Sequence, residues 1–92
     1  MTRDYRFDCT CGACPEQYDV YRERDNKYVG YIRCRWGYIV AHPVIEGQIV
    51  WDIDIYEEYL DDGWRGTIPD TDKVFNAVAE ALDKLYGQLE TD

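Results

Sequence analysis

The chain has 92 residues, of which 19 are Asp or Glu and 10 are Lys or Arg, so its formal net charge is −9 at pH 7. This length fits one domain with one modest core, and the acidity disfavours direct contact with nucleic acid or with the phosphates of a membrane. Charged residues interrupt the first twenty positions, so we expect no secretory signal, no membrane span and a cytoplasmic location.

The N-terminal segment, residues 1–17, is expected to be irregular and rich in cysteine. It contains a C-x-C-x-x-C spacing within CTCGACPEQY, residues 9–18. In a reducing cytoplasm such a cluster more often holds a metal or takes part in redox chemistry than forms structural disulfides. We predict one structural zinc ion with four thiolate ligands, namely Cys9, Cys11, Cys14 and Cys34, and with His42 as a substitute fourth ligand. The alternatives are a disulfide or redox pair, or unliganded thiols with Cys34 buried as a small apolar residue.

Alternation of apolar and polar residues predicts an antiparallel sheet over residues 18–56. The four expected strands are YDVYRE (18–23), KYVGYIRCRW (27–36), YIVAHPV (38–44) and IVWDIDIY (49–56). In the second strand, alternation assigns one face to Tyr28, Ile32, Cys34 and Trp36, and the other to Tyr31, Arg33 and Arg35. In the fourth strand, the core side is expected to hold Ile49, Trp51, Ile53 and Ile55, with Asp52 and Asp54 facing water.

After the sheet, residues 57–69 are expected to form an acidic loop and residues 70–89 a helix. Asp70 or Thr71 can cap this helix, and Gly87 can end it. An apolar stripe runs along it at helical spacing, made of Val74, Phe75, Val78, Ala81, Leu82, Leu85, Tyr86 and Leu89. The predicted fold is therefore a single α+β domain, residues 1–92, in which a four-stranded antiparallel meander carries one C-terminal helix on its apolar face.

The chain is poorly equipped for catalysis, since it has no serine and one histidine, and it lacks the common phosphate-binding and zinc-protease motifs. A small thiol- or metal-dependent catalyst or redox protein, centred on the cysteines and His42, is the enzymatic alternative. Binding of single-stranded nucleic acid is disfavoured by Asp52 and Asp54, which we expect on the same face as the residues that would carry it, Tyr21, Arg22, Arg24, Tyr31, Arg33 and Arg35. We expect those arginines to pair with the carboxylates instead.

Negative charge is concentrated in the second half of the chain. Residues 46–92 hold thirteen Asp or Glu and three Lys or Arg, whereas residues 1–45 hold six and seven. Such a surface is either a solvated acidic face or a docking site for a basic surface. The predicted partner-binding residues are Asp52, Asp54, Tyr56, Glu57, Glu58, Tyr59, Asp61, Asp62 and Trp64. A zinc-stabilised adaptor domain that binds a peptide along a sheet edge is a further hypothesis.

PEQYDVYRERDNKYVGYIRCRWG, residues 15–37, resembles small uncharacterised proteins encoded by phages and mobile elements of bacteria, which combine a PEQYDV-like start with a GYIR-like strand. Small acidic phage proteins often inhibit host defence, some in the manner of anti-CRISPR proteins and some by imitating nucleic acid. The resemblance implies a non-enzymatic inhibitor that acts in the host cytoplasm and docks on a basic, nucleic-acid-binding surface of a host protein.

Overall fold

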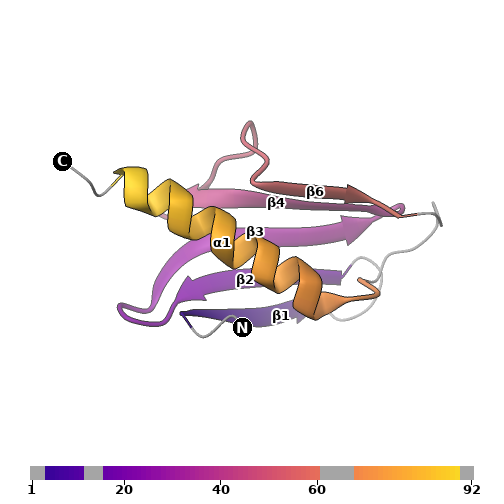
Figure 1. The fold of residues 1–92 in the computed structure, drawn as a ribbon, viewed down its shortest axis with the longest axis horizontal. Helices are drawn as coiled ribbons and strands as arrows, with labels where there is room; N and C mark the ends of the chain where they lie inside the picture. The colour runs from indigo at the N-terminus through magenta and orange to yellow at the C-terminus, as the bar shows by residue number, and fades with distance from the viewer. Residues whose placement is uncertain (1–3, 12–15, 61–67, 90–92) are drawn as a thin grey trace.

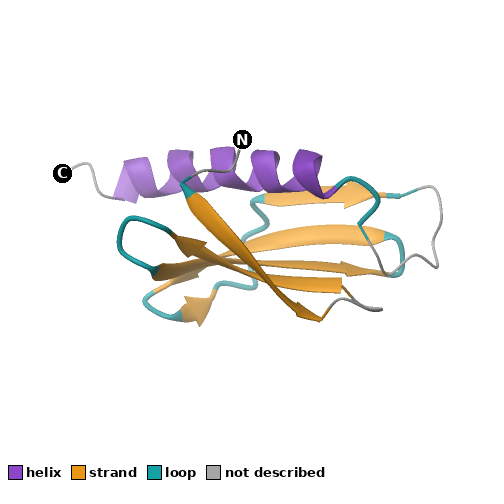
Figure 2. Cartoon of the chain, turned by 90° about the horizontal axis from the view of Figure 1, so that it is seen from below, coloured by secondary structure: helices purple, strands orange, loops and turns teal. Residues whose placement is uncertain are grey.

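The structure is a computed structural model that describes residues 4–11, 16–60 and 68–89. Its elements are β1 (Tyr5–Cys11), β2 (Glu16–Arg22), β3 (Lys27–Arg35), β4 (Tyr38–Ile45), β5 (Gln48–Ile49), β6 (Tyr56–Tyr59) and α1 (Thr71–Leu89). The strands form one antiparallel sheet in the order β1-β2-β3-β4, and both β5 and β6 pair with β4. Helix α1 crosses one face of this sheet, and no other element of the described residues covers the opposite face (Figures 1 and 2). The predicted α+β class and helix-on-sheet arrangement are confirmed.

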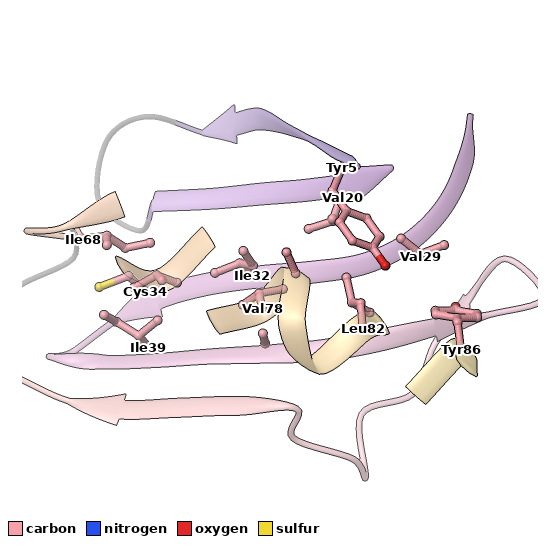
Figure 3. Close-up of a cluster of buried hydrophobic side chains, with 13 residues drawn as sticks. Tyr5, Val20, Val29, Ile32, Cys34, Ile39, Ile68, Val78, Leu82 and Tyr86 are labelled. Atoms are coloured by element: carbon pink, nitrogen blue, oxygen red, sulfur yellow. The ribbon is translucent and has the colours of Figure 1, made fainter. Parts of the chain in front are cut away.

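The core lies between α1 and the sheet. The helix contributes its predicted stripe, with Val74, Val78 and Leu82 fully buried, and these side chains meet Ile32 and Ile39 from the middle strands (Figure 3). Burying such aliphatic side chains contributes roughly 1.5–3 kcal/mol each. This face of the sheet, called here the inner face, is therefore the source of most of the stability.

The ends of the helix follow its local sequence only in part. Asp70 caps the first turn, because its carboxylate accepts a hydrogen bond from the Lys73 backbone N–H at 3.1 Å. Gly87 does not end the helix, contrary to the prediction, since α1 continues to Leu89. Of the described residues, no helix combines the length and the apolar character needed to cross a membrane.

The sheet has more strands than predicted, because the N-terminal segment is not irregular throughout. Residues Tyr5–Cys11 form β1, which pairs with β2. Within it, Tyr5 is buried, and the Phe7 ring stacks on Phe75 of α1 with ring centroids 4.2 Å apart. Alternating aromatic and charged residues thus build an edge strand whose aromatic side faces the helix.

In β3 the predicted faces are wrong at both ends of the strand. A β-bulge shifts the register so that Val20 pairs with Gly30 but Tyr21 pairs with Tyr28. The extra residue, Val29, turns inward, and Tyr28 moves to the outer face, where its hydroxyl donates to Asp19 at 3.1 Å. At the other end, Trp36 lies in the turn to β4 and is 70% exposed.

Two tight turns depend on residues with positive φ. Trp36 (55°) and Gly37 (72°) connect β3 to β4, and Glu46 (55°) and Gly47 (78°) connect β4 to β5. Two consecutive residues of positive φ are the signature of the type I′ turn, whose twist matches that of the strands it joins. Leaving the strand for this turn removes Trp36 from the core side.

The predicted fourth strand, residues 49–56, is also wrong in its middle. Strand β5 ends at Ile49 and β6 begins at Tyr56, with an arch between them. The backbone groups of Ala41 and Pro43 face this edge of β4, because their carbonyls accept from Ile55 and Val50, each at 2.9 Å. Proline has no N–H to donate, so a continuous strand cannot complete its ladder here. The acidic loop predicted for residues 57–69 accordingly begins with β6.

Gly30 and Gly87 allow a matched test of this packing. A Cβ at Gly30 would lie 3.3 Å from Val20 Cβ and 3.4 Å from Leu82 Cδ1, whereas a Cβ at Gly87 would meet nothing within 4 Å. We expect Gly30→Ala to lower the free energy of unfolding by about 1–3 kcal/mol through overpacking. Gly87→Ala should raise it by up to about 1 kcal/mol, since alanine favours a helix. Urea unfolding followed by circular dichroism measures both, and equal effects would contradict the close approach of α1 to β3.

Candidate interaction surface

The most distinctive local feature is the arch formed by residues 50–55. Three backbone hydrogen bonds hold it: two to β4, and one within the arch from the Ile53 N–H to the Val50 carbonyl at 3.3 Å. The side chain of His42 adds a fourth tie, with Nδ1 lying 3.0 Å from the Ile53 carbonyl oxygen and 3.3 Å from Asp54 Oδ1. His42 is buried, so its ring nitrogen finds a polar partner in the backbone of the arch.

Four consecutive residues of the arch face solvent, namely Trp51, Asp52, Ile53 and Asp54. Trp51 is 54% exposed and Ile53 is 43% exposed, so the expected burial of these two side chains is wrong. The Trp51 ring nevertheless has a defined position, because it packs edge to face with Tyr31 (centroids 5.8 Å apart) and with His42 (5.2 Å). The arch therefore displays apolar and acidic groups side by side.

The arch continues into a strip of aromatic and acidic side chains on the outer face of β4 and β6. The Tyr38 hydroxyl donates to Glu57 at 2.8 Å, and the Tyr38 ring stacks on Tyr59 with centroids 4.6 Å apart. The Glu57 hydrogen bond raises the pKa of Tyr38 to about 12, and the charge of Asp54 contributes to this shift. Together with Tyr31 of β3 and with Trp51 and Asp54 of the arch, these side chains form a surface that we call the outer strip. It consists of Tyr31, Tyr38, Trp51, Asp54, Glu57 and Tyr59, and the buried His42 supports it.

The predicted partner-binding residues divide between the two faces. Asp52, Asp54, Glu57 and Tyr59 are exposed, and Tyr59 is 76% exposed. Tyr56 and Glu58 lie on the helix side, where Glu58 accepts hydrogen bonds from the Tyr56 hydroxyl at 2.6 Å and from Lys73 Nζ at 2.9 Å. These bonds lower the pKa of Glu58, with Tyr56 the larger cause. The remaining predicted residues, Asp61, Asp62 and Trp64, lie outside the described residues.

Sequence reasoning missed the contribution of Tyr31, Tyr38, His42 and Trp51 to this surface. Alternation places Tyr31 on the outer face, as observed, but gives it a functional role only in the nucleic-acid hypothesis. His42 was considered only as a metal ligand or catalytic group. The signal that could have found the arch is Pro43 in the neighbouring strand, since a strand pairing with that edge must be interrupted.

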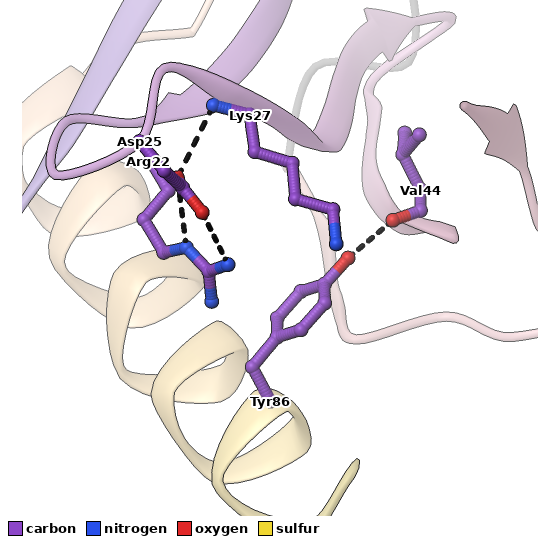
Figure 4. A network of polar contacts seen from close by, with 5 residues as sticks. All are labelled: Arg22, Asp25, Lys27, Val44 and Tyr86. Atoms are coloured by element: carbon purple, nitrogen blue, oxygen red, sulfur yellow. Dashed lines mark hydrogen bonds and ion pairs between the residues drawn. The ribbon is translucent and has the colours of Figure 1, made fainter. Parts of the chain in front are cut away.

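Among the residues that the structure describes, no arginine forms the expected pair with Asp52 or Asp54. Arg22 is buried beside α1, where it forms a 2.7 Å ion pair with Asp25 and lies 5.3 Å from the centre of the Tyr86 ring (Figure 4). Asp54 instead contacts His42. On the sheet face, the guanidinium of Arg6 lies over an aromatic ring, with its central carbon 4.6 Å from the centre of the Tyr21 ring.

A hollow of about 510 Å³ lies beside the last turns of α1, and Tyr5, Arg22, Asp83 and Tyr86 are among the residues that line it. Its polar groups make contacts within the fold. The Tyr5 hydroxyl donates to Asp83 at 2.6 Å, and the Tyr86 hydroxyl donates to the carbonyl oxygen of Val44 (Figure 4). These bonds fasten the helix to β1 and β4, so we assign this region to stability.

The predicted zinc ligands are described only in part. Cys9 is exposed on β1, whereas Cys34 is buried in the core. Cys34 pairs with Ile39 of β4, and directly paired residues point to the same face of a sheet. His42 lies three residues after Ile39 on the same strand, so its side chain points to the face opposite that of Ile39 and Cys34. His42 therefore cannot pair with Cys34 in catalysis. No group of three or more His, Cys, Asp or Glu side chains suited to a metal occurs among the described residues, but the Cys11 side chain and all of Cys14 lie outside them, so the zinc site stays a prediction.

Comparisons with protein-family models, with curated proteins and with solved structures found no match to this chain. The resemblance of residues 15–37 to phage and mobile-element proteins therefore stays a prediction. The functional argument that follows depends on the geometry of the outer strip and the arch.

The two glutamates of β6 allow a test of their separate roles. We expect Glu58→Gln to lower the free energy of unfolding at pH 7 by up to about 1 kcal/mol, because an exposed ion pair is worth no more than this. The folded-state pKa of Glu58 is lowered, so its stabilisation exists above the unfolded pKa and is lost as the pH falls through the folded value. Urea unfolding between pH 7 and pH 3 should show the two proteins converging in acid. Glu57→Gln, with the same charge change but no lysine partner, is the control and should not reproduce this pH dependence.

The zinc prediction has its own test. Native mass spectrometry of protein purified under reducing conditions without added metal is expected to show a mass excess of one zinc ion. Cys9→Ser should remove the metal, because a tetrahedral structural site needs all four ligands. A metal-free wild-type protein with four titratable thiols would exclude the zinc site.

Proposed function

We propose that this protein is a non-enzymatic binding domain that docks on a basic protein surface through the outer strip and the arch. The observation that carries the proposal is the run of four exposed residues, Trp51 to Asp54, which backbone hydrogen bonds and contacts with the buried His42 hold against β4. Two large apolar side chains are exposed there next to two carboxylates. Exposed apolar surface does not stabilise the fold, but a partner that covers it can gain binding energy from it.

The residue types fit a protein partner. Tryptophan and tyrosine are the side chains most enriched among the residues that dominate binding energy at interfaces. Rings that already pack on neighbours, such as Trp51 on Tyr31 and Tyr59 on Tyr38, lose little conformational freedom when a partner covers them. The carboxylates of Asp54 and Glu57 lie between these rings along the strip and would meet positive charge.

The net charge indicates which kind of partner this surface would attract. The net charge of −9 repels nucleic acid and attracts basic proteins over a distance of about 8–10 Å at physiological salt. A basic surface that holds nucleic acid is the kind of target that the phage-protein resemblance implies. Competition between this domain and nucleic acid for that target would then be the inhibitory mechanism. A predicted zinc ion would staple the N-terminal segment in this scheme and take no part in binding.

A catalyst centred on the cysteines and His42 is the weaker candidate. Cys34 and His42 are on opposite faces, and His42 Nδ1 contacts the arch rather than a thiol. An activated nucleophile needs its base within hydrogen-bond reach. The proposal therefore gives His42 a structural role, as the support of the arch.

Exposed tryptophans at two places allow a matched binding test. We expect the tagged protein, incubated at low salt with nuclease-treated lysate of its source cells, to retain a protein with a basic surface that salt releases. Trp51→Ala should reduce this retention at least ten-fold, because removing a central aromatic anchor typically costs about 2 kcal/mol or more. Trp36→Ala removes a side chain of similar exposure from the β3–β4 turn and should retain the partner. Quantitative mass spectrometry of the eluates measures all three.

The carboxylates are tested in the same assay. Asp52→Asn together with Asp54→Asn should weaken retention and reduce its sensitivity to salt. Equal retention by wild type, Trp51→Ala and the Asn variant would contradict the proposed surface. If the tagged protein retained nucleic acid instead of protein from lysate without nuclease treatment, the nucleic-acid alternative would be favoured.

A further inference from the structure

We propose that the corner formed by Tyr31, Trp51 and Asp54 receives an arginine side chain of the partner. We call these three residues the cation corner, and the inference rests on the proposed function because it names what the outer strip recognises. The corner offers the aromatic surface of Trp51 and the carboxylate of Asp54, and both groups contact the same imidazole, that of His42. Trp51 packs against His42 at a centroid distance of 5.2 Å, and Asp54 Oδ1 lies 3.3 Å from His42 Nδ1.

The geometry of the rings suits a flat cation. The Tyr31 and Trp51 rings pack edge to face with an angle of 78° between their planes, and Trp51 is 54% exposed, so part of the indole surface is open to a ligand. A cation over an aromatic face is stabilised by about 0.5–2 kcal/mol, most strongly over tryptophan. The nearby carboxylate adds a charge-assisted hydrogen bond to the same ligand. Together they recognise a group that is both planar and positively charged.

The chain itself contains such an arrangement on the same face of the sheet. The Arg6 guanidinium lies 4.6 Å from the centre of the Tyr21 ring, and its Nε donates to the two oxygens of Asp8 at 3.0 and 3.1 Å. One aromatic ring and one aspartate thus hold an arginine there, together with the Asn26 side-chain oxygen, which accepts from the Arg6 guanidinium at 2.9 Å. The cation corner has the aromatic ring and the aspartate, but the described residues place no guanidinium against Trp51 or Asp54. An arginine from a partner would complete it.

Arginine is favoured over lysine for a physical reason. Guanidinium is planar, stacks on an aromatic face and can donate two parallel hydrogen bonds to a carboxylate, whereas ammonium is compact and strongly hydrated. One internal group opposes the ligand. Arg33 lies two residues from Tyr31 on β3, close enough for its charge to affect that tyrosine. Its positive charge should weaken binding of a second cation. Removing that charge should therefore tighten binding, the opposite of the effect expected from removing Asp54.

The experiment uses three peptides and NMR signals of the tryptophan indoles. The peptides are acetyl-Gly-Arg-Gly-Arg-Gly-amide, its lysine counterpart, and a citrulline counterpart that keeps the shape of arginine without its charge. Single Trp→Phe variants assign the indole N–H signals. We expect the arginine peptide to shift the Trp51 signal with a Kd at least three-fold below that of the lysine peptide. The citrulline peptide should cause no shift, and the Trp36 signal should not move.

Three variants separate the corner from general electrostatics. Asp54→Asn should weaken arginine-peptide binding about ten-fold, while Asp52→Asn, with the same change in net charge, should weaken it less than about two-fold. Arg33→Gln should tighten binding. A full amide spectrum confirms that each variant is folded.

Several outcomes would overturn the inference. These are an unmoved Trp51 signal at saturating peptide, equal losses in Asp54→Asn and Asp52→Asn, or binding of the citrulline peptide with equal affinity. A lysine peptide that binds as tightly as the arginine peptide would overturn the choice of arginine. If the lysate partner depends on Trp51 while the peptides fail, the cation corner is wrong and the proposed function stands. If the partner does not depend on Trp51, the proposed function itself fails.

Discussion

A single helix packed against one face of a sheet is the constraint on which the rest of this structure depends. The stripe of α1 supplies Val74, Val78 and Leu82 to a core that this chain length can just fill. Gly30 lets the helix approach β3 closely, and polar contacts such as Tyr5 with Asp83 fasten its far end. Because one helix cannot cover both faces, the outer face must be stable in water. Its side chains pack against one another in pairs instead of against a second layer.

The arch is a consequence of one missing hydrogen-bond donor. Pro43 presents a carbonyl but no N–H to the edge of β4, so the chain leaves the sheet after Ile49 and returns at Tyr56. His42, the residue before Pro43, then binds the Ile53 carbonyl on the outer side. The missing N–H of Pro43 and the side chain of His42 thus determine the position of the arch that carries Trp51. The surface that we assign to binding arises from this local interruption.

The sequence predicted the elements whose patterns have one interpretation. The stripe of α1 and the alternation in β2, β3 and β4 gave the helix, the two central hairpins and the α+β class. β1 was not predicted, although Tyr5, Arg6, Phe7 and Asp8 alternate, because the cysteine spacing in the same segment favours an irregular metal-binding loop. In residues 49–56 the alternation of isoleucine and aspartate suggested a buried strand, and only pairing with Pro43 shows otherwise. The bulge at Val29 has no marker in the sequence beyond the neighbouring glycine, because register depends on the partner strand.

The candidate site was predictable in its chemistry and not in its geometry. The acidic surface from Asp52 to Asp62 was expected to bind a basic partner, yet alternation along β6 directs Glu58 toward Lys73 and leaves Glu57 on the outer face. The inner carboxylate contributes to folding, and the outer one is available to a partner. On the outer face, Arg33 on β3 pairs across with Val40 of β4, which in turn pairs with Glu57 of β6, whereas Arg6 lies at the far edge on β1 and already forms an ion pair with Asp8. In the proposed complex, a basic partner would be attracted by Asp54 and Glu57 and repelled by Arg33, so this arrangement would influence its position along the sheet as well as its affinity.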